Sequence, residues 1–145
     1  MKQETDNGKN NEHLFLPMCY LYRNCVELSL KTILFDEIDE CFQIKCKCMQ
    51  EKKHSIIGMW NKLEPYIAQN ANESNDAEYL SVIEDYCTQI HNIDGDANKF
   101  RYPMSKEMKP YFPSEKKFDF METGDFFEAL NNILDGIDNM LKYTK

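Results

Sequence analysis

The chain has 145 residues, of which 42% are hydrophobic and 29% are charged. These proportions are typical of a folded globular domain and exclude a largely disordered chain. No apolar run approaches the roughly 18 residues that a membrane span needs, so we expect no membrane partner. The net charge of −8 argues against a broad nucleic-acid-binding surface, which normally carries a basic face, and RNA is therefore a disfavoured partner.

The first 13 residues, MKQETDNGKNNEH, are polar and lack the apolar stretch of a secretion signal. We expect them to form a disordered N-terminal tail, with residues 14–145 forming a single domain. A chain without a signal is expected in the cytoplasm, where its six cysteines would stay reduced.

Apolar spacing predicts the first helix over about residues 14 to 38. Its apolar side chains fall on two faces, so we expect a helix at the centre of a bundle, buried nearly all round. The two faces consist of Leu21, Cys25, Leu28 and Phe35 on one side and Val26, Leu30 and Ile33 on the other.

Residues 39 to 53 show no clear period, so helix and loop are equally open there. The second helix is predicted from about His54, and Pro65 is expected to kink it because the proline ring removes one backbone donor. A third helix follows a polar stretch in which Asn75 and Glu78 have the spacing of a capping box.

Residues 94 to 121 lack a helical period and are rich in aromatic side chains. Such a long aperiodic segment is either functional or disordered, and the aromatic content favours ordered packing on the bundle surface. The last helix, over about residues 124 to 142, has the clearest apolar stripe. We therefore predict an all-α bundle of four to five helices with a long aromatic-rich connection before the last helix.

A polar ridge of Arg23, Glu27 and Lys31 interrupts the first helix. The three residues are spaced four apart and stack on one face, with Asn24 beside them. A buried arginine needs a carboxylate or another acceptor, and Glu27 is one turn away. Two interpretations stay open: a polar groove in which Arg23 binds a phosphate or carboxylate, and a solvated stripe in which Glu27 and Lys31 form an ordinary surface pair.

Three short motifs carry a family resemblance. YLYRNCVELSLK, residues 20–31, resembles the first conserved helix of prokaryotic HEPN-domain proteins, in which an arginine and a polar residue precede a Glu-Leu pair and a lysine. HSIIGMW, residues 54–60, resembles the start of their next helix, and FRYP, residues 100–103, resembles a segment of uncharacterised members. The resemblance implies a compact HEPN-like α-helical bundle, often dimeric, of the kind found in toxin–antitoxin and phage-defence systems.

Many proteins of that family are metal-independent ribonucleases. Their signature is an arginine, a polar residue and a histidine about four to six positions after the arginine, because histidine transfers protons near neutral pH and arginine stabilises charge on the scissile phosphate. Arg23 and Asn24 match the opening pair, but positions 27 to 30 hold no histidine. His54 and His91 are the candidates for the histidine that the signature lacks here. A second interpretation of each is an ordinary residue at a helix end.

Two further groups of residues are candidate sites. Residue types that bind zinc occur at Cys41, Cys46, Cys48 and His54, but the segment contains no Cys-x-x-Cys pair. We therefore predict reduced thiols, no metal and no cofactor. In the FRYP segment, Arg101 beside Tyr102 either grips an acidic group of a partner or pins the long connection to the bundle through Asp94 or Asp96.

The leading functional hypothesis is a non-catalytic HEPN-like interaction module in a toxin–antitoxin or phage-defence context. It would act as a homodimer or with another protein, and its binding residues would be Arg23, Lys31, Arg101 and Tyr102.

Two alternatives belong to other classes. In an atypical metal-independent ribonuclease, Arg23 and Arg101 would stabilise the phosphate, with Asn24 and Glu27 nearby and His54 or His91 transferring the proton. In a phage-encoded inhibitor, the acidic surface would mimic nucleic acid and bind a basic defence protein.

Overall fold

A computed structural model of the chain describes residues 2–70, 76–95, 97–100, 106–109 and 120–143, with side chains described from residue 14 onward and not at 76, 77 or 120. Within these ranges the regular elements are five helices joined by turns, with no strand, which confirms the predicted all-α bundle. The helices are α1 (Lys2–Glu37), α2 (Phe42–Lys52), α3 (Ile56–Asn70), α4 (Asp76–Asp94) and α5 (Phe120–Tyr143). None of the helices in the described part is long and apolar enough to cross a membrane.

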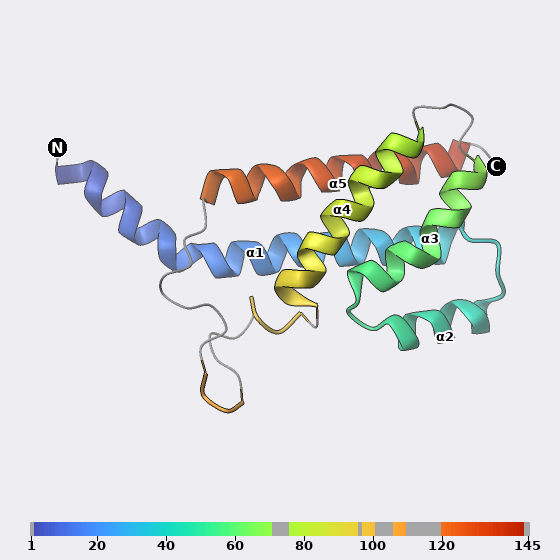
Figure 1. Ribbon diagram of the computed structural model, residues 1–145, viewed down its shortest axis with the longest axis horizontal. Helices are drawn as coiled ribbons and strands as arrows, with labels where there is room; N and C mark the ends of the chain where they lie inside the picture. Colours follow the sequence, from blue (N-terminus) through green and yellow to red (C-terminus); the bar gives the residue numbers. More distant parts are fainter. Residues whose placement is uncertain (1, 71–75, 96, 101–105, 110–119, 144–145) are drawn as a thin grey trace.

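The longest helix, α1, forms the axis of the bundle. It runs alongside α5 over most of its length, while α3 and α4 pack together as a second layer across the α1–α5 pair and α2 lies next to α3 (Figure 1). The main core joins α1, α3, α4 and α5, and a smaller cluster of Phe15, Cys19 and Phe100 lies apart from it. The most deeply buried large side chains of the main core include Leu30 of α1, Met59 and Trp60 of α3, Ile83 of α4 and Leu130 of α5. The short α2 contributes no buried residue.

The N-terminal part of α1 differs from the expected disordered tail. The helix begins at Lys2 instead of near residue 14, and this part projects beyond the other helices (Figure 1). A helix that is already formed propagates at little cost, so a polar segment can continue it without an apolar stripe. Pro17 lies inside the helix and cannot donate a hydrogen bond to the preceding turn. The ribbon bends between the projecting part and the rest of α1 (Figure 1).

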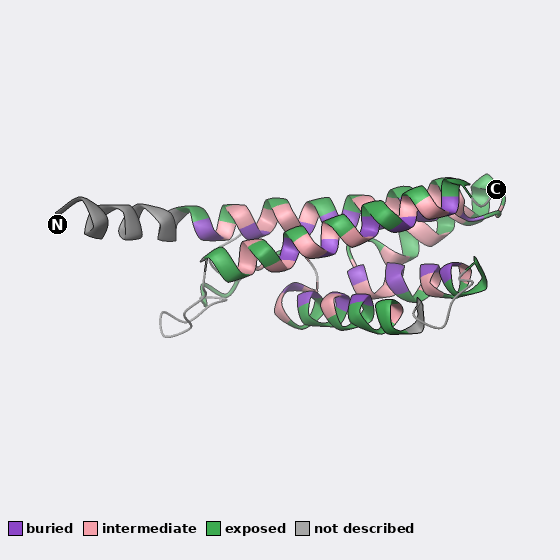
Figure 2. Ribbon diagram, turned by 90° about the horizontal axis from the view of Figure 1, so that it is seen from above, coloured by how far each residue is buried: buried purple, intermediate pink, exposed green. Residues whose placement is uncertain are grey.

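The expectation that α1 is buried nearly all round is wrong. Val26, Leu30 and Ile33 are buried as predicted, but Leu21 and Leu28 on the other face are 62% and 54% exposed. A helix buries only the faces against which other helices pack, and α3, α4 and α5 all lie toward the first face. Exposed positions therefore recur along α1, and similar ones recur along α5 (Figure 2).

The remaining boundaries follow from local chemistry. The undecided segment at 39–53 is largely helical, as α2. Ser55 precedes α3 and its hydroxyl accepts a hydrogen bond from the Gly58 amide at 3.1 Å, which is an N-cap contact. Pro65, expected to kink this helix, lies inside it. Asn75 of the expected capping box lies outside the described residues, as does most of the aromatic connection, and α5 begins four residues before its predicted start at 124.

Candidate functional site

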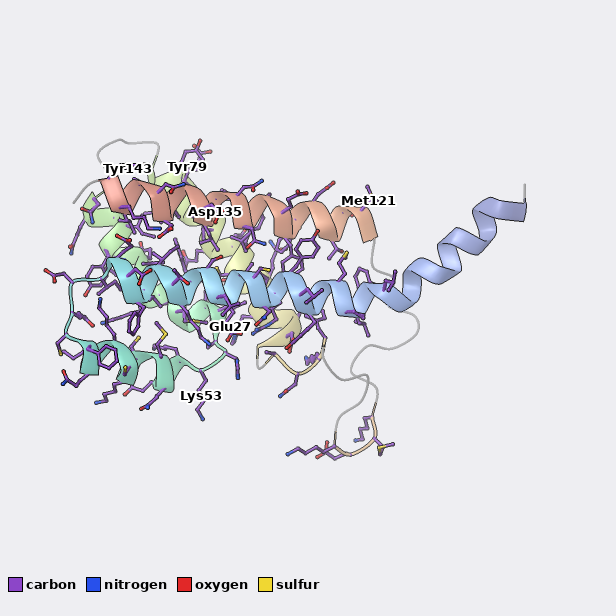
Figure 3. All side chains as sticks on the ribbon, turned by 180° about the vertical axis from the view of Figure 1, so that it is seen from behind. Glu27, Lys53, Tyr79, Met121, Asp135 and Tyr143 are labelled. Carbon is purple, nitrogen blue, oxygen red and sulfur yellow. The ribbon has the colours of Figure 1, made fainter. Side chains whose placement is uncertain are left out.

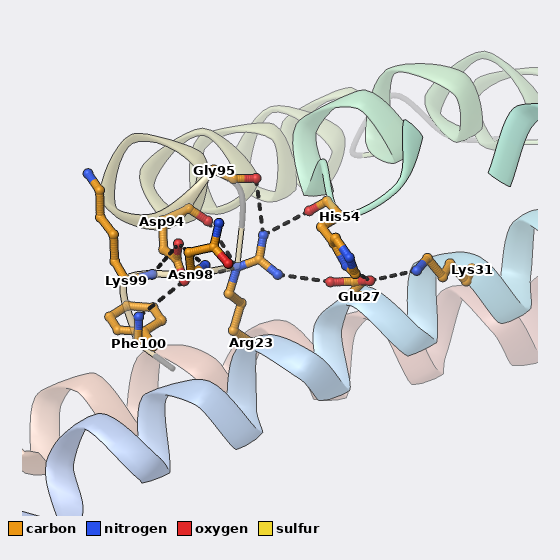
Figure 4. A network of polar contacts seen from close by, with 9 residues as sticks. All are labelled: Arg23, Glu27, Lys31, His54, Asp94, Gly95, Asn98, Lys99 and Phe100. Atoms are coloured by element: carbon orange, nitrogen blue, oxygen red, sulfur yellow. Dashed lines mark hydrogen bonds and ion pairs between the residues drawn. The ribbon is translucent and has the colours of Figure 1, made fainter. Parts of the chain in front are cut away.

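Two of the three residues of the α1 polar ridge, Arg23 and Glu27, are buried, and Arg23 is the centre of the network. The guanidinium is 1% exposed and donates from Nη1 to Glu27 Oε2 at 2.9 Å, within the same helix. Nε donates to the backbone carbonyl of Asp94 at 3.0 Å, and Nη2 donates to the carbonyls of His54 at 2.8 Å and Gly95 at 3.4 Å (Figure 4). One side chain thus joins α1 to the start of α3 and to the end of α4.

The carbonyls that Arg23 binds have no partner within a helix. The carbonyls of Asp94 and Gly95 stand at the C-terminus of α4, where the last turn leaves acceptors unpaired and the helix dipole favours a cation. The carbonyl of His54 belongs to the tight turn between α2 and α3, in which Lys53 has a positive φ of 49°. A planar guanidinium with five N–H donors can satisfy several such acceptors at once, which lysine cannot do.

Asp94 organises the chain that leaves α4. Its buried carboxylate accepts hydrogen bonds from the backbone amides of Asn98 at 2.9 Å, Lys99 at 3.0 Å and Phe100 at 3.4 Å (Figure 4). Oδ2 also lies 3.7 Å from Nε of Arg23. The same aspartate therefore balances the arginine charge and folds the start of the long connection against α1.

Glu27 carries two further contacts on its second oxygen. Oε1 accepts a hydrogen bond from Nζ of Lys31 at 2.6 Å and lies 2.9 Å from Nδ1 of His54. Glu27 is 4% exposed, whereas the His54 side chain is 60% exposed. Burial alone raises the pKa of the Glu27 carboxyl, but the hydrogen bonds and positive charges of Lys31 and His54 outweigh it and hold this pKa below its ordinary value of 4.5.

A cleft of about 180 Å³ opens beside this network. Its walls include Arg23, Glu27, Asn24 and His54 from the predicted set, together with Tyr20, Ala97 and Asn98. Four predicted candidates therefore meet in space, and the fold brings His54 to the three α1 residues across a sequence separation of 27 residues from Glu27. Arg23 and Glu27 form the buried floor, and His54 is the exposed group at the edge.

Of the other predicted site residues, the two that the structure describes, His91 and Lys31, do not line the cleft. His91 is exposed on the last turn of α4 and lies against Gly95, where its ring atom Cε1 would be 3.1 Å from a Cβ added to that glycine. Lys31 reaches the network only through Glu27. Arg101 and Tyr102 lie outside the described residues, and so does Asp96, one of the acids proposed to pin Arg101.

The predicted ridge is neither of the two arrangements weighed from the sequence. Glu27 and Arg23 are buried, so the ridge is not a solvated stripe, and the Arg23 donors already bind groups of the chain itself. The role of Asp94 as the second carboxylate for Arg23 was missed, because the sequence separation of 71 residues carries no signal for that contact. In the sequence, only the position of Asp94 before a glycine at a predicted helix end indicated a structural role for this aspartate.

The cysteines and the other residues that could bind a metal ion form no metal site in the described part of the chain. All six thiols are free, with Cys19 and Cys87 buried and Cys41 exposed. No three His, Cys, Asp or Glu side chains of the residues with described positions are arranged to hold a metal ion. Burial raises the pKa of the Cys19 and Cys87 thiols to about 12.

A second polar cluster joins the end of α1 to α3. Glu40 Oε1 accepts hydrogen bonds from the Tyr66 hydroxyl at 2.8 Å and from Nζ of Lys62 at 3.0 Å. The bond from Tyr66 and then the bond from Lys62 lower the pKa of the Glu40 carboxyl. The cluster lies at the surface and fixes the connection between α1 and α2.

Comparisons with protein-family models, with curated proteins and with solved structures find no match to this chain.

Proposed function

We propose that this chain is a non-catalytic, protein-binding helical bundle of the HEPN-like kind. The observation that supports the proposal is the state of Arg23, whose four hydrogen bonds all go to Glu27 and to main-chain carbonyls. These bonds use four of the five N–H donors, so a phosphate could be held by two donors of this guanidinium only by displacing one of those acceptors. In a ribonuclease the arginine must instead direct donors at the scissile phosphate.

The charges around Arg23 support the same proposal. The buried carboxylates of Glu27 and Asp94 lie 2.9 Å and 3.7 Å from its nitrogens and already neutralise it. Any phosphate entering the neighbouring cleft would approach these two negative groups in a region of low dielectric, where repulsion is strong. The cleft is therefore poorly suited to RNA, in agreement with the net charge of −8.

The surface of α1 supports a role in binding protein. Leu14, Leu21 and Leu28 are each more than half exposed on one helix. Large apolar side chains that gather on one exposed surface mark interaction sites more often than single scattered ones do. The toxin–antitoxin or phage-defence setting of the proposal depends on the resemblance of residues 20–31 to HEPN-domain proteins.

A second candidate, a metal-independent ribonuclease, is favoured by one contact. Glu27 Oε1 lies 2.9 Å from Nδ1 of His54, an arrangement in which a carboxylate orients a histidine whose other ring nitrogen is free to transfer a proton. The exposed His54 lines the cleft, so a substrate could reach it. Lys31, with its side chain 29% exposed, would have to supply the charge that Arg23 cannot.

Incubation of total RNA with the purified protein and a chelator separates the two candidates. The proposal predicts no cleavage by the wild type or by His54→Ala, with folding of both checked by circular dichroism. His54→Ala is preferable to an Arg23 variant because the exposed imidazole can be removed without opening the core. Chelator-resistant cleavage that disappears in His54→Ala would overturn the proposal and establish the ribonuclease.

A further inference from the structure

The exposed side of α1 has a seven-residue repeat. Leu14, Leu21 and Leu28 are 58%, 62% and 54% exposed and lie one heptad apart. The uncharged residues that lie three or four positions from each leucine complete a spacing that alternates between three and four residues. Core positions of two-stranded coiled coils have this spacing. We call this surface the leucine face; it consists of Leu14, Met18, Leu21, Cys25, Leu28 and Thr32 and ends before Phe35, whose ring packs against Phe42 and Lys45 of α2.

The leucine face carries no charge on a chain in which 29% of residues are charged. It spans 19 residues, from Leu14 to Thr32, or about 28 Å of helix at 1.5 Å per residue. A face that packs on a domain core is usually wider than a strict 3.5-residue stripe, whereas a narrow stripe with leucine in successive heptads fits one facing helix. The occupant that the repeat specifies is therefore another long helix.

We infer that this occupant is the leucine face of a second copy, packed parallel and in register. The inference rests on the proposed function and adds the surface, the partner and the orientation. Identical residues one heptad apart are self-complementary when two identical helices lie side by side, because leucine layers then meet leucine layers. In Figure 3, α1 lies in front of α4, with α5 beside it, so the side of α1 away from α4 faces the viewer.

The charges beside the face select the parallel orientation. On one flank, α5 places Asp135 and Asp138 along a groove of about 200 Å³ that Leu28 and Thr32 also line, and Asp138 pairs with Lys142 within α5. On the other flank lies Lys31. Figure 3 shows Asp135 and the ridge residue Glu27 on opposite sides of α1.

Parallel pairing brings unlike flanks together. In a parallel two-stranded pair each flank meets the opposite flank of the other helix, so Asp135 of one copy approaches Lys31 of the other. In an antiparallel pair like flanks meet, and the Asp135 side of one copy would face the Asp135 side of the other, which is repulsive. The parallel arrangement also places Cys25 opposite Cys25 of the second copy, at a separation of roughly 6 Å, which a disulfide can bridge.

Sedimentation equilibrium and thiol cross-linking test the inference. The wild type should sediment at twice 17.2 kDa at micromolar concentration. The double variant Leu21→Glu, Leu28→Glu changes only exposed side chains and should be folded, with self-association weakened at least a hundredfold. Tyr79→Glu is the matched control, since Tyr79 is 61% exposed on α4, and it should dimerise as the wild type does.

Oxidation with copper phenanthroline reports the orientation. The wild type and Cys41→Ser should form a disulfide-linked dimer, and Cys25→Ser should not, although Cys41 is exposed in it. A monomeric wild type, or a dimer that persists in the double variant, overturns the inference. A dimer that dissociates in the double variant but never cross-links through Cys25 overturns the parallel arrangement. These outcomes are independent of the RNA assay, because a monomer that leaves RNA intact contradicts only this inference, and RNA cleavage contradicts only the proposed function.

Discussion

Arg23 and Glu27 form an ion pair one helical turn apart, with Nη1 and Oε2 separated by 2.9 Å and both side chains buried. An exposed pair at this spacing contributes only a few tenths of a kcal/mol. Here the arginine also binds the ends of α3 and α4, so the pair belongs to a network that holds three helices together. The pair therefore helps to fix the positions of α1, α3 and α4 relative to one another.

Replacing Arg23 by methionine should destabilise the bundle by roughly 3–5 kcal/mol, because Glu27 and Asp94 would remain buried without their cation. Arg23→Lys should cost less but still more than about 1 kcal/mol, since an ammonium cannot reproduce the fork of donors. Urea denaturation measures both values. Glu51→Gln, at the exposed pair with Lys47, is the control and should change stability by less than about 0.5 kcal/mol. An Arg23→Met variant as stable as this control would contradict the structural role.

Stability should fall in acid partly through Glu27. Its pKa in the folded chain lies below the ordinary 4.5, so its contribution is complete above pH 4.5 and is lost as the pH falls through the lower folded value. Glu27→Gln should cost about 2 kcal/mol at pH 7. The difference in unfolding free energy between wild type and variant should narrow below pH 4.5 in a series of urea titrations. A difference that stays constant down to pH 2 would show that Glu27 is not ionised in the network.

Asp94→Asn should loosen the chain that follows α4. The carboxylate accepts backbone hydrogen bonds from Asn98, Lys99 and Phe100, and a neutral amide oxygen is a weaker acceptor for them. We expect the amides of these residues to exchange with deuterium at least tenfold faster in the variant, as measured by NMR. Amides in the middle of α5 serve as the internal reference and should change only by the loss of global stability.

Tyr66→Phe should raise the pKa of Glu40. The tyrosine hydroxyl is the first cause that lowers this pKa, and the bond from Lys62 is the second. Removing the hydroxyl leaves the carboxylate with one fewer donor, so its pKa should move back toward 4.5. Titration of the Glu40 side-chain carboxyl carbon by NMR measures the shift. Glu27 has no contact with Tyr66 among those described, and its titration should be unchanged.

Thiol reactivity should divide the cysteines by burial. Cys19 and Cys87 are buried and their pKa values are raised to about 12, so at pH 8 they are almost entirely protonated and inaccessible. Cys41 is exposed and should react with Ellman's reagent within minutes. Mass spectrometry of the labelled peptides should find Cys19 and Cys87 modified only after unfolding in urea. Rapid labelling of Cys87 in the folded protein would contradict its burial in the core.

The helices were predictable because their causes are local. Apolar spacing alone located α3, α4 and α5 to within a few residues, and the spacing of Arg23, Glu27 and Lys31 placed them on one face of α1. Segments without a period, such as 39–53, could not be assigned, because α2 buries no residue and therefore has no stripe to detect.

The partners of these helices were decided only by the tertiary structure. The sequence of α1 shows two apolar faces, but burial of Val26 and exposure of Leu21 depend on which side α3, α4 and α5 occupy. In the same way, the composition of α1 requires a partner for Arg23, yet the choice of Asp94 and the carbonyl of His54 follows from helix packing across long separations in the chain. Periodicity is a property of one segment, whereas burial and charge pairing are properties of the assembled bundle.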